Sequence, residues 1–248
     1  MFLADKVILI TGASKGIGRA VAERVANDGA KVVINYLSDS KSAEEMVERI
    51  GSDNALAVQA DVSKVADIER LVAAAVEKFG KIDVVMPNAG YMGMKDLSHS
   101  TEADYDRHFD LNVKGAAFLV QKAVAHMPTS GGGRVIFVSS GLTTSTNVSP
   151  AYVMYAASKG AVDQLTRVLA KDLARRNITV NAVAPGPTAT ELFFDGKCEQ
   201  LVSVIKAASP FNRLGEPSEI ASVVAFLAGP ESAWVSGQVI RVNGANMV

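Results

Sequence analysis

The sequence has little of several features that define specialised classes of protein. Its 248 residues include one cysteine, Cys198, and aromatic residues make up 6% of the chain. A single cysteine excludes an intramolecular disulfide, and no motif around Cys198 marks it as a nucleophile. No apolar run reaches the roughly 18 residues that a membrane-spanning helix needs. The chain also opens without the charged region and long apolar stretch of a signal peptide, so we expect a soluble cytoplasmic protein with no membrane partner.

An excess of one charge sign is also missing. The chain has 25 basic and 26 acidic residues, for a formal net charge of −1. This balance gives no reason to expect nucleic acid as a partner, and it suits a small or neutral substrate. His99, His108 and His126 have no metal-ligand spacing with Cys198 or with one another, so no metal site is predicted.

What the sequence does contain is an alternation of short β-branched runs with longer amphipathic stretches, the pattern of strand–helix–strand units. Most of the short runs are apolar throughout, as in strands that helices cover on both faces. The predicted strands are Val7–Thr11, Lys31–Tyr36, Ala55–Ala60, Ile82–Met86, Arg134–Ser139, Ile178–Ala184 and Gly237–Val242. The predicted helices are Gly16–Asn27, Ser42–Ile50, Lys64–Phe79, Thr101–Met127 as two helices, Tyr152–Arg176 and Pro217–Leu227. This predicts an α/β fold with a doubly wound, Rossmann-type parallel sheet of about seven strands and helices on both faces.

No repeat, proline-rich linker or block of charge divides the chain, so residues 1–248 are predicted to form one dinucleotide-binding catalytic domain. The least regular stretch is Thr188–Glu216, which is rich in phenylalanine and glycine. Long irregular loops often serve as active-site lids, and we expect a mobile substrate lid here.

A glycine-rich turn follows the first predicted strand and opens the first predicted helix. Its sequence is Thr11-Gly12-Ala13-Ser14-Lys15-Gly16-Ile17-Gly18. Gly12 permits a tight turn, Gly16 permits close approach of the backbone to a pyrophosphate, and Gly18 permits close packing of helix on sheet. Free N–H groups at the helix N-terminus would then bind the phosphates. The glycine spacing of three residues and then one differs from the general dinucleotide fingerprint, but the strand–turn–helix context is that of such a site.

The end of the second predicted strand favours NADP(H) over NAD(H). NAD enzymes usually place an acid there to bind the ribose 2′-hydroxyl, whereas this chain has no carboxylate before Asp39. Lys15 supplies positive charge for a 2′-phosphate, and Asn35 and Ser38 offer hydrogen bonds next to Tyr36. The competing interpretation is that Lys15 is only a solvated loop lysine.

A tyrosine and a lysine in the long predicted helix form a candidate acid–base pair. Tyr155 and Lys159 are four residues apart and therefore lie on one helical face. A nearby ammonium stabilises a phenolate and is expected to lower the pKa of Tyr155 from its usual value of about 10. Ser140 ends the fifth predicted strand, at the sheet edge where ligands bind, and its hydroxyl is suited to polarising a carbonyl. Ser139 is the alternative, and Thr143 or Thr144 could also reach the substrate.

These motifs together resemble the short-chain dehydrogenase/reductase family over nearly the whole chain. The matching residues are Thr11–Gly18, Asp61, Val62, Asn88, Ala89, Gly90, Asn112, Ser140, Tyr155, Lys159, Pro185, Gly186, Thr188 and Thr190. Within the family the chain is most similar to reductases of β-ketoacyl thioesters and related polyketide-type or small ketones. One departure is that Ser140 lies fifteen residues before Tyr155, somewhat farther than in many members.

The resemblance implies a role for each matching residue. Tyr155 would transfer the proton, Lys159 would lower its pKa and hold the nicotinamide ribose, and Ser140 would position the carbonyl. Asn112 would take part in a proton relay through water, Asp61 and Val62 would contact the adenine, and Asn88 and Ala89 the adenosine side. The segment after Gly186 would hold the carboxamide. The other cofactor-binding candidates here are Gly90, Pro185, Gly186, Thr188 and Thr190. A homotetramer, or at least a homodimer, is also implied, with Trp234 near a subunit contact.

The sequence therefore predicts an NADPH-dependent oxidoreductase that reduces a ketone to a secondary alcohol. The same residues would serve alcohol oxidation, so the direction stays open. A non-catalytic NADP(H)-binding sensor or scaffold is the alternative from another class. An epimerase or dehydratase is disfavoured because related enzymes of that kind usually carry a longer C-terminal substrate domain. Substrate contacts are expected in Tyr91–Leu97, Gly141–Val153 and Thr188–Phe211, with Met92, Met94, Phe193 and Phe194 as candidate pocket residues.

Overall fold

The computed structural model describes residues 2–247 and contains a single sheet of seven parallel strands. The strands are β1 (Val7–Ile10), β2 (Lys31–Tyr36), β3 (Ala55–Gln59), β4 (Val84–Met86), β5 (Gly133–Val138), β6 (Ile178–Pro185) and β7 (Val239–Val242). Their order across the sheet is β3-β2-β1-β4-β5-β6-β7. All seven predicted strands are present, and the prediction of a doubly wound parallel sheet in one domain is confirmed.

Apolar, largely β-branched sequences explain the central strands. Every residue of β1 is buried, and so is every residue of β5. Strands buried on both faces are stabilised by side chains packed above and below the sheet. Alternate residues of one strand therefore enter different cores: Ile10 and Ile136 pack on one face, and Leu9 and Phe137 pack on the other.

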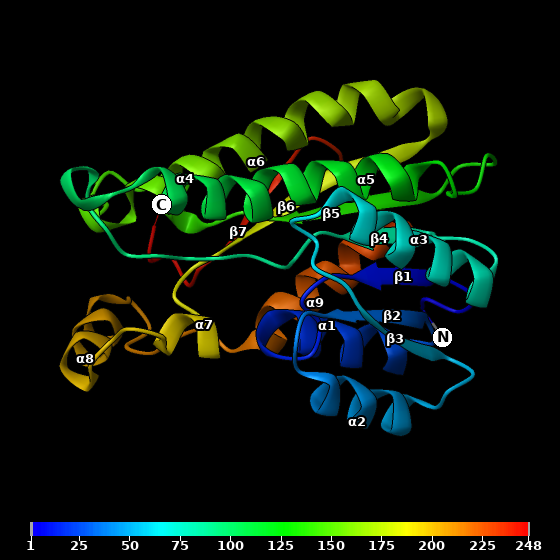
Figure 1. The fold of residues 1–248 in the computed structure, drawn as a ribbon, viewed down its shortest axis with the longest axis horizontal. Helices are drawn as coiled ribbons and strands as arrows, with labels where there is room; N and C mark the ends of the chain where they lie inside the picture. Colours follow the sequence, from blue (N-terminus) through cyan, green and yellow to red (C-terminus); the bar gives the residue numbers. More distant parts are fainter. Residues whose placement is uncertain (1, 248) are drawn as a thin grey trace.

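Helices cover both faces of this sheet, as Figure 1 shows. One face is covered by α1 (Gly16–Asn27), α2 (Ser40–Ile50) and α9 (Pro217–Ala228). The opposite face is covered by α3 (Val65–Phe79), α5 (Ala116–Val124) and the long α6 (Val153–Leu173), with α4 (Glu102–Phe109) alongside. None of the helices formed by residues 2–247 combines the length and the apolarity that crossing a membrane requires.

The predicted helical stretch Thr101–Met127 is divided, as expected, but by a π-helical turn. Thr101 begins it with a capping box, in which its side chain accepts from the Asp104 N–H and Asp104 accepts from the Thr101 N–H. The turn, Asp110–Gly115, separates α4 from α5. A β-carbon on Gly115 would lie 2.2 Å from the Val62 carbonyl oxygen, so this turn packs closely on the segment after β3.

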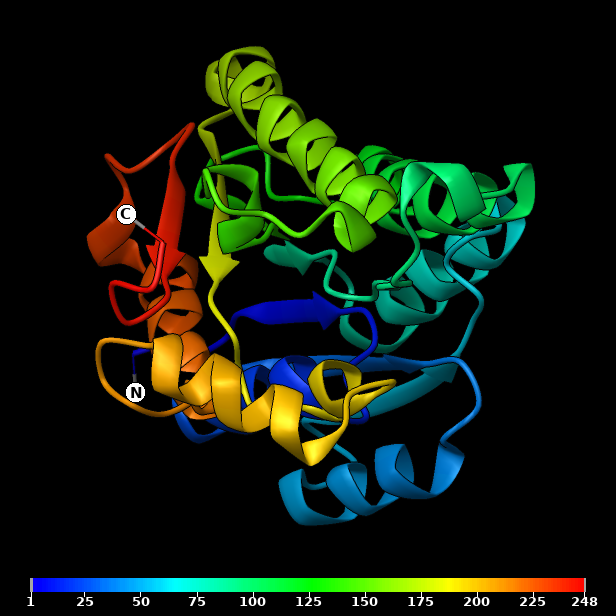
Figure 2. The ribbon, with the colours of Figure 1, turned by 90° about the vertical axis from the view of Figure 1, so that its left-hand side faces the viewer.

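The stretch Thr188–Glu216 is more regular than its sequence predicts. It contains α7 (Glu191–Phe194) and α8 (Glu199–Ala208). Every residue of α8 is at least partly exposed, so it lacks the buried apolar stripe that marks a packed helix. In Figure 1 these two helices stand apart from both helical layers, and Figure 2 shows them in front of the sheet.

The strand order reverses between β1 and β4. The chain runs outward from β1 to β2 and β3 and then returns to place β4 on the other side of β1, with Ile8 paired to Val84. Helices on opposite faces diverge at such a point and leave a crevice at the carboxyl ends of the strands. The fold therefore determines where a ligand site lies before any side chain is considered.

Candidate active site

A cleft of about 1100 Å³ occupies the carboxyl edge of the sheet. The predicted site residues that line it are Gly12, Lys15, Gly16, Ile17, Asn88, Ala89, Gly90, Ser140, Tyr155, Lys159, Pro185, Gly186, Thr188 and Thr190. Those outside its lining are Ser14, Gly18, Asn35, Tyr36, Ser38, Asp61, Val62 and Asn112. The structure thus brings together residues from the loops after β1, β4, β5 and β6 and from α6.

The glycine turn adopts the geometry that its sequence predicts. Gly12 and Gly16 have φ values of +60° and +56°, a region that side chains with a β-carbon rarely adopt. Gly18 has no such strain, but a β-carbon there would lie 2.5 Å from the Gly12 carbonyl oxygen. The first two glycines therefore allow the turn, and the third allows α1 to begin against it.

The loop after β4 supports the same turn. The Asn88 side chain donates to the carbonyls of Thr11 (2.8 Å) and Gly12 (3.1 Å). The Thr11 hydroxyl accepts from the backbone N–H groups of Asn88 and Ala89, both at 3.0 Å. These bonds join the carboxyl ends of β1 and β4, and they place Ala89 and Gly90 on the cleft wall.

The Asn35 side chain is buried and engaged within the protein, and its contact with a cofactor stays a prediction. Its side-chain oxygen accepts from the Gly12 N–H at 3.2 Å. Its amide donates to the Ala60 carbonyl at 3.0 Å and to the carbonyls of Tyr36 and Val58 at 3.3 Å. Asn35 therefore fixes the glycine turn to β2 and β3 from behind.

Positive charge does gather beside the end of β2. Lys15 is exposed at the N-cap of α1. Hydrogen bonds from Ser42 lower the pKa of Asp39, and the nearby charges of Lys15 and Arg19 lower it further. Lys15 and Arg19 therefore face the segment after β2, where a 2′-phosphate is expected. Sequence analysis missed Arg19, although its position one helical turn after Lys15 was a usable signal.

Four of the predicted cofactor contacts lie at or after the ends of β2 and β3, outside the cleft lining: Tyr36, Ser38, Asp61 and Val62. Tyr36 ends β2, and Ser38 follows it on the exposed surface. Asp61 accepts from the backbone and hydroxyl of Ser63, and Val62 is buried. Their contact with a cofactor remains a prediction.

Tyr155 and Lys159 face the cleft from the first turns of α6, as their spacing predicts. The Lys159 ammonium is buried, lies 5.8 Å from the centre of the Tyr155 ring and donates to the Val138 carbonyl at 2.7 Å. That bond ties α6 to the end of β5. It also directs the lysine under Gly90, where a β-carbon would lie 3.7 Å from the ammonium.

The pKa of Tyr155 moves in the direction opposite to the one predicted. Burial raises it to about 12, a hydrogen bond with Ser140 acts to lower it, and Tyr152 raises it again. Burial also lowers the pKa of Lys159 to about 8, against the upward influence of Asp163. Removing a charged form from water is the dominant cost at both groups. Tyr155 therefore keeps its proton at neutral pH, the state that a general acid requires.

The two candidate serines after β5 have different environments. The Ser139 hydroxyl donates to the buried carboxylate of Asp163, on α6, in a very short hydrogen bond. Ser140 instead lies close enough to Tyr155 to act on its pKa, and its hydroxyl accepts from the Leu142 N–H at 3.3 Å. Both residues line the cleft, but the Ser139 hydroxyl is engaged with Asp163, and only Ser140 acts on the pKa of Tyr155. This arrangement favours Ser140 over Ser139 as the group that meets a carbonyl.

Asn112 lies in the π-helical turn and does not line the cleft. Its side-chain oxygen accepts from the Tyr91 N–H at 2.8 Å, and its amide donates to the Tyr91 carbonyl and the Ser158 hydroxyl, both at 2.9 Å. Ser158 in turn donates to the Tyr155 carbonyl at 2.8 Å. The Asn112 side chain therefore joins the loop after β4 to the backbone of Tyr155, and a proton relay through it remains a prediction.

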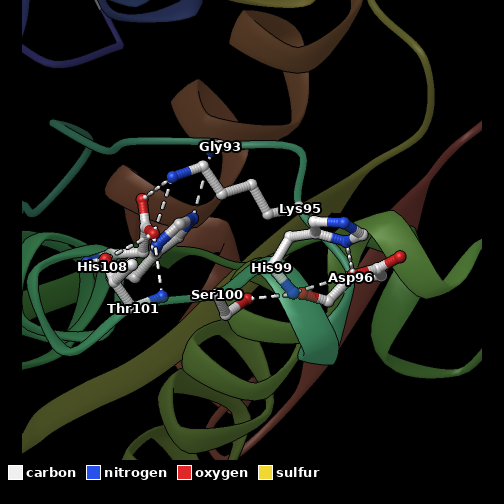
Figure 3. A network of polar contacts seen from close by, with 8 residues as sticks. Gly93, Lys95, Asp96, His99, Ser100, Thr101 and His108 are labelled. Atoms are coloured by element: carbon white, nitrogen blue, oxygen red, sulfur yellow. Dashed lines mark hydrogen bonds and ion pairs between the residues drawn. The ribbon is translucent and has the colours of Figure 1, made fainter.

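The loop after β4 is held by two polar clusters, shown in Figure 3. In one, buried His108 accepts from the Gly93 N–H at 3.1 Å, while its other ring nitrogen lies 2.6 Å from the Asp104 carbonyl oxygen. In the same cluster, Lys95 donates to the Asp104 carboxylate. In the second cluster, Asp96 accepts from the backbone N–H of His99. The Gly93–His108 bond fixes a segment whose neighbour Met92 lines the cleft.

The segment after β6 completes the cleft and leads into α7. A β-carbon on Gly186 would lie 2.9 Å from the Asn243 backbone, so the chain passes here without room for a side chain. Thr188 donates to the Gly186 carbonyl, and Thr190 caps α7. The cleft residues that were not named individually from the sequence are Val138, Leu142, Ser145, Asn147, Tyr152, Pro187, Glu191, Leu192, Asp195, Gly196, Lys197, Ile205, Ala208, Asn246 and Met247. Only Tyr152 carried a signal, because it lies one helical turn before Tyr155.

The residues present fit a nicotinamide dinucleotide. Two glycines with left-handed backbone form an uncrowded cradle at the positive end of α1, as phosphate groups require. The cleft continues from this cradle past Ala89 and Lys159 to Tyr155 and Ser140. A dinucleotide that extends along it would bring its reactive ring to the tyrosine.

Comparisons with known proteins agree with this geometry. Residues 12–245 match the family model described as enoyl-(acyl carrier protein) reductase. The chain is 40% identical to a short-chain type dehydrogenase/reductase of Picea abies, over 99% of this chain and 93% of that protein. It superposes on a short-chain dehydrogenase of Burkholderia cenocepacia in complex with NADP (TM-score 0.93, 32% identity, full coverage of both chains). It also superposes on an angucycline C-6 ketoreductase with bound NADP (TM-score 0.91, 37% identity, 99% and 97% coverage). The chain therefore belongs to the short-chain dehydrogenase/reductase family of oxidoreductases.

Proposed function

We propose that this protein uses NADPH to reduce a ketone to a secondary alcohol. The observation that carries the proposal is that Tyr155, Ser140 and Lys159 line the same cleft as the glycine turn. A non-catalytic sensor needs the cofactor cradle but has no use for a buried phenol directed at the substrate end of the cleft.

Each of the three polar side chains at this end of the cleft has a separate role in the proposed reduction. NADPH, when bound, supplies the hydride. The Ser140 hydroxyl donates a hydrogen bond to the carbonyl oxygen of the substrate, and Tyr155 delivers the proton as negative charge develops on that oxygen. Lys159, held by the Val138 carbonyl, places positive charge beneath the tyrosine and stabilises the phenolate that results. In the oxidative direction each step runs in reverse through the same groups.

Charge beside the end of β2 supports NADP(H) as the cofactor. Lys15 and Arg19 lie close enough to Asp39 to lower its pKa, so they provide positive potential where the 2′-phosphate would lie. Two similar solved structures, the Burkholderia dehydrogenase and the angucycline ketoreductase, contain NADP.

The substrate end of the cleft supports a largely apolar ketone. Met92, Leu142 and Phe193 line it, and Phe194 packs edge-on against Phe193. The ketoreductase among the similar structures supports a polyketide-type ketone, as the sequence predicts. We further propose that α7 and α8 form the lid, that the chain forms a homotetramer or homodimer, and that it works in the cytoplasm.

The first experiment is to measure NADPH and NADH oxidation separately, by absorbance at 340 nm, against ketones, β-ketoesters and β-ketoacyl thioesters. Turnover of one class with NADPH is the expected result. Tyr155→Phe should retain NADPH binding and lose roughly 10²- to 10⁴-fold in turnover, the usual contribution of a general acid.

Unchanged turnover in Tyr155→Phe would exclude the proton-donor role. Tight NADPH binding without turnover in either direction, across the whole panel, would instead favour a sensor or scaffold.

A further inference from the structure

Lys197 is the one lysine of the cleft lining whose ammonium is buried without a partner. It lies between α7 and α8, and its Nζ has no hydrogen-bond partner among residues 2–247. The Lys197 ammonium lies over the ring of Phe193, 5.0 Å from its centre. The other two lysines of the lining differ: Lys159 donates to the Val138 carbonyl, and Lys15 is exposed to water.

An ammonium in this environment is unsatisfied. A buried cation that has lost its water needs an acceptor, and a ring face replaces only part of the lost hydration. Burial accordingly lowers the pKa of Lys197, while the charge of Asp195 acts to raise it. Beyond its contact with the Phe193 ring, the ammonium makes no hydrogen bond to another element in the described chain.

The position of Lys197 is that of a substrate-facing group. The adjoining Gly196 approaches the loop after β4, since a β-carbon on it would lie 3.3 Å from the Met94 methyl group. The two sides of the cleft therefore meet here, with Met92 on one side and Phe193 on the other. The lid segment that contains Lys197 also brings apolar side chains to the cleft, Leu192, Phe193 and Phe194, together with the carboxylates of Glu191 and Asp195. Lys197 is the one cation that this segment contributes to the lining.

We propose that Lys197 determines substrate specificity by binding an anionic oxygen on the substrate. The substrate would be a ketone with an apolar or aromatic body and an acidic substituent, either a carboxylate or an ionised phenol. The ketone end would meet Tyr155 and Ser140, and the acidic end would meet the lid. This inference rests on the proposed ketone reduction and names the substrate class for it.

Matched pairs of aromatic ketones test this specificity. The carboxylate arm compares 4-acetylbenzoate with its methyl ester, and the phenolate arm compares 4′-hydroxyacetophenone with 4′-methoxyacetophenone at a pH where the phenol ionises. Each pair is assayed on the wild type, Lys197→Met, Lys197→Arg and Lys206→Met. Lys206 is the matched control, because it is an exposed lysine on α8 that does not line the cleft.

The expected readout is the ratio of kcat/KM for the anion to kcat/KM for its neutral partner. Lys197→Met should lower this ratio about 10- to 100-fold in at least one arm, the range for a hydrogen bond to a charged group. Lys197→Arg should largely preserve the ratio, and Lys206→Met should leave it unchanged. The arm that responds identifies carboxylate or phenolate as the ligand.

Calorimetric titration of the same anions into the protein–NADP⁺ complex separates this inference from the proposed function. Binding that weakens in Lys197→Met, without any ketone turnover, would support the anion site and exclude the reductase. Ketone turnover with the same anion ratio in wild type and Lys197→Met would retain the reductase and overturn the inference. Wild type that binds neither anion more tightly than its neutral partner would also overturn it.

Discussion

Burial sets the proton affinities of the two titratable residues on α6 that face the cleft. It raises the pKa of Tyr155 to about 12 and lowers that of Lys159 to about 8. The tyrosine thus remains an acid across the physiological range. The lysine is the group of this pair whose charge changes near neutrality, and its effect on stability can be measured directly.

Lys159 should make the cofactor-free protein more stable as the pH rises. Its pKa in the folded chain is about 8, below its ordinary value of 10.5, so the unfolded chain holds more protons between these two values. The free energy of unfolding should therefore increase from pH 8 to 10.5 relative to Lys159→Met, by about 3 kcal/mol at most. Urea denaturation of both proteins across this range provides the measurement. A difference that is constant or decreases with pH would contradict the prediction.

At the scale of elements, helix α1 presents both its N-terminus and its first basic residues to the cofactor end of the cleft. The Lys15 side chain makes no capping hydrogen bond to α1, whereas the Arg19 side chain donates to the Glu23 carboxylate at 2.9 Å. Lys15→Ala should therefore reduce the preference for NADPH over NADH about tenfold, because a charged hydrogen bond to the 2′-phosphate is lost.

The ratio of kcat/KM for the two cofactors measures this preference. Lys41→Ala, which removes an exposed lysine from α2, is the control. An unchanged ratio in Lys15→Ala would mean that Lys15 is only a solvated loop residue.

The π-helical turn and α4 determine the shape of the loop after β4 through His108. His108 is buried, and replacing it with leucine removes two hydrogen-bonding groups. These are the acceptor for the Gly93 N–H and the donor to the Asp104 carbonyl. His108→Leu should therefore raise KM for the ketone severalfold and leave the dissociation constant of NADPH almost unchanged. His99→Leu is the control, because His99 is exposed and pairs only with Asp96 and Ser98. Equal effects of both variants would show that the Gly93–His108 bond does not shape the substrate site.

At the scale of the whole molecule, large apolar side chains remain exposed on the outer helical layer. Phe118 on α5 is 36% exposed and Val168 on α6 is 54% exposed, and Trp234 elsewhere on the surface is 99% exposed. We expect exposed apolar side chains on this layer to take part in a subunit contact.

Light scattering should accordingly give the mass of a tetramer or dimer for the wild type. Phe118→Lys with Val168→Lys should give a smaller species if α5 and α6 meet a second copy. Val204→Lys on α8, which removes an apolar side chain that is 64% exposed, should not change the mass. A wild-type monomer would contradict the expected assembly.

Local sequence determined much of this protein because its signals depend on few neighbours. Apolar β-branched runs specify buried parallel strands, and the glycines at 12, 16 and 18 specify a turn through backbone freedom and close packing. The separation of Tyr155 and Lys159 by one helical turn follows from helix geometry alone. The fold and most of the cleft lining were therefore predictable from residue types and spacing.

Tertiary structure decided the features that depend on burial and on partners distant in sequence. The hydrogen bonds of the buried Asn35 side chain to the glycine turn and to the segment after β3 arise from residues distant in sequence. The upward pKa of Tyr155 and the choice between Ser139 and Ser140 depend on how α6 packs against the end of β5. The unpaired ammonium of Lys197 exists only because α7 and α8 fold over the cleft. Spacing along the chain fixes which side chains share a face, but desolvation and long-range hydrogen bonds arise only when separate elements meet.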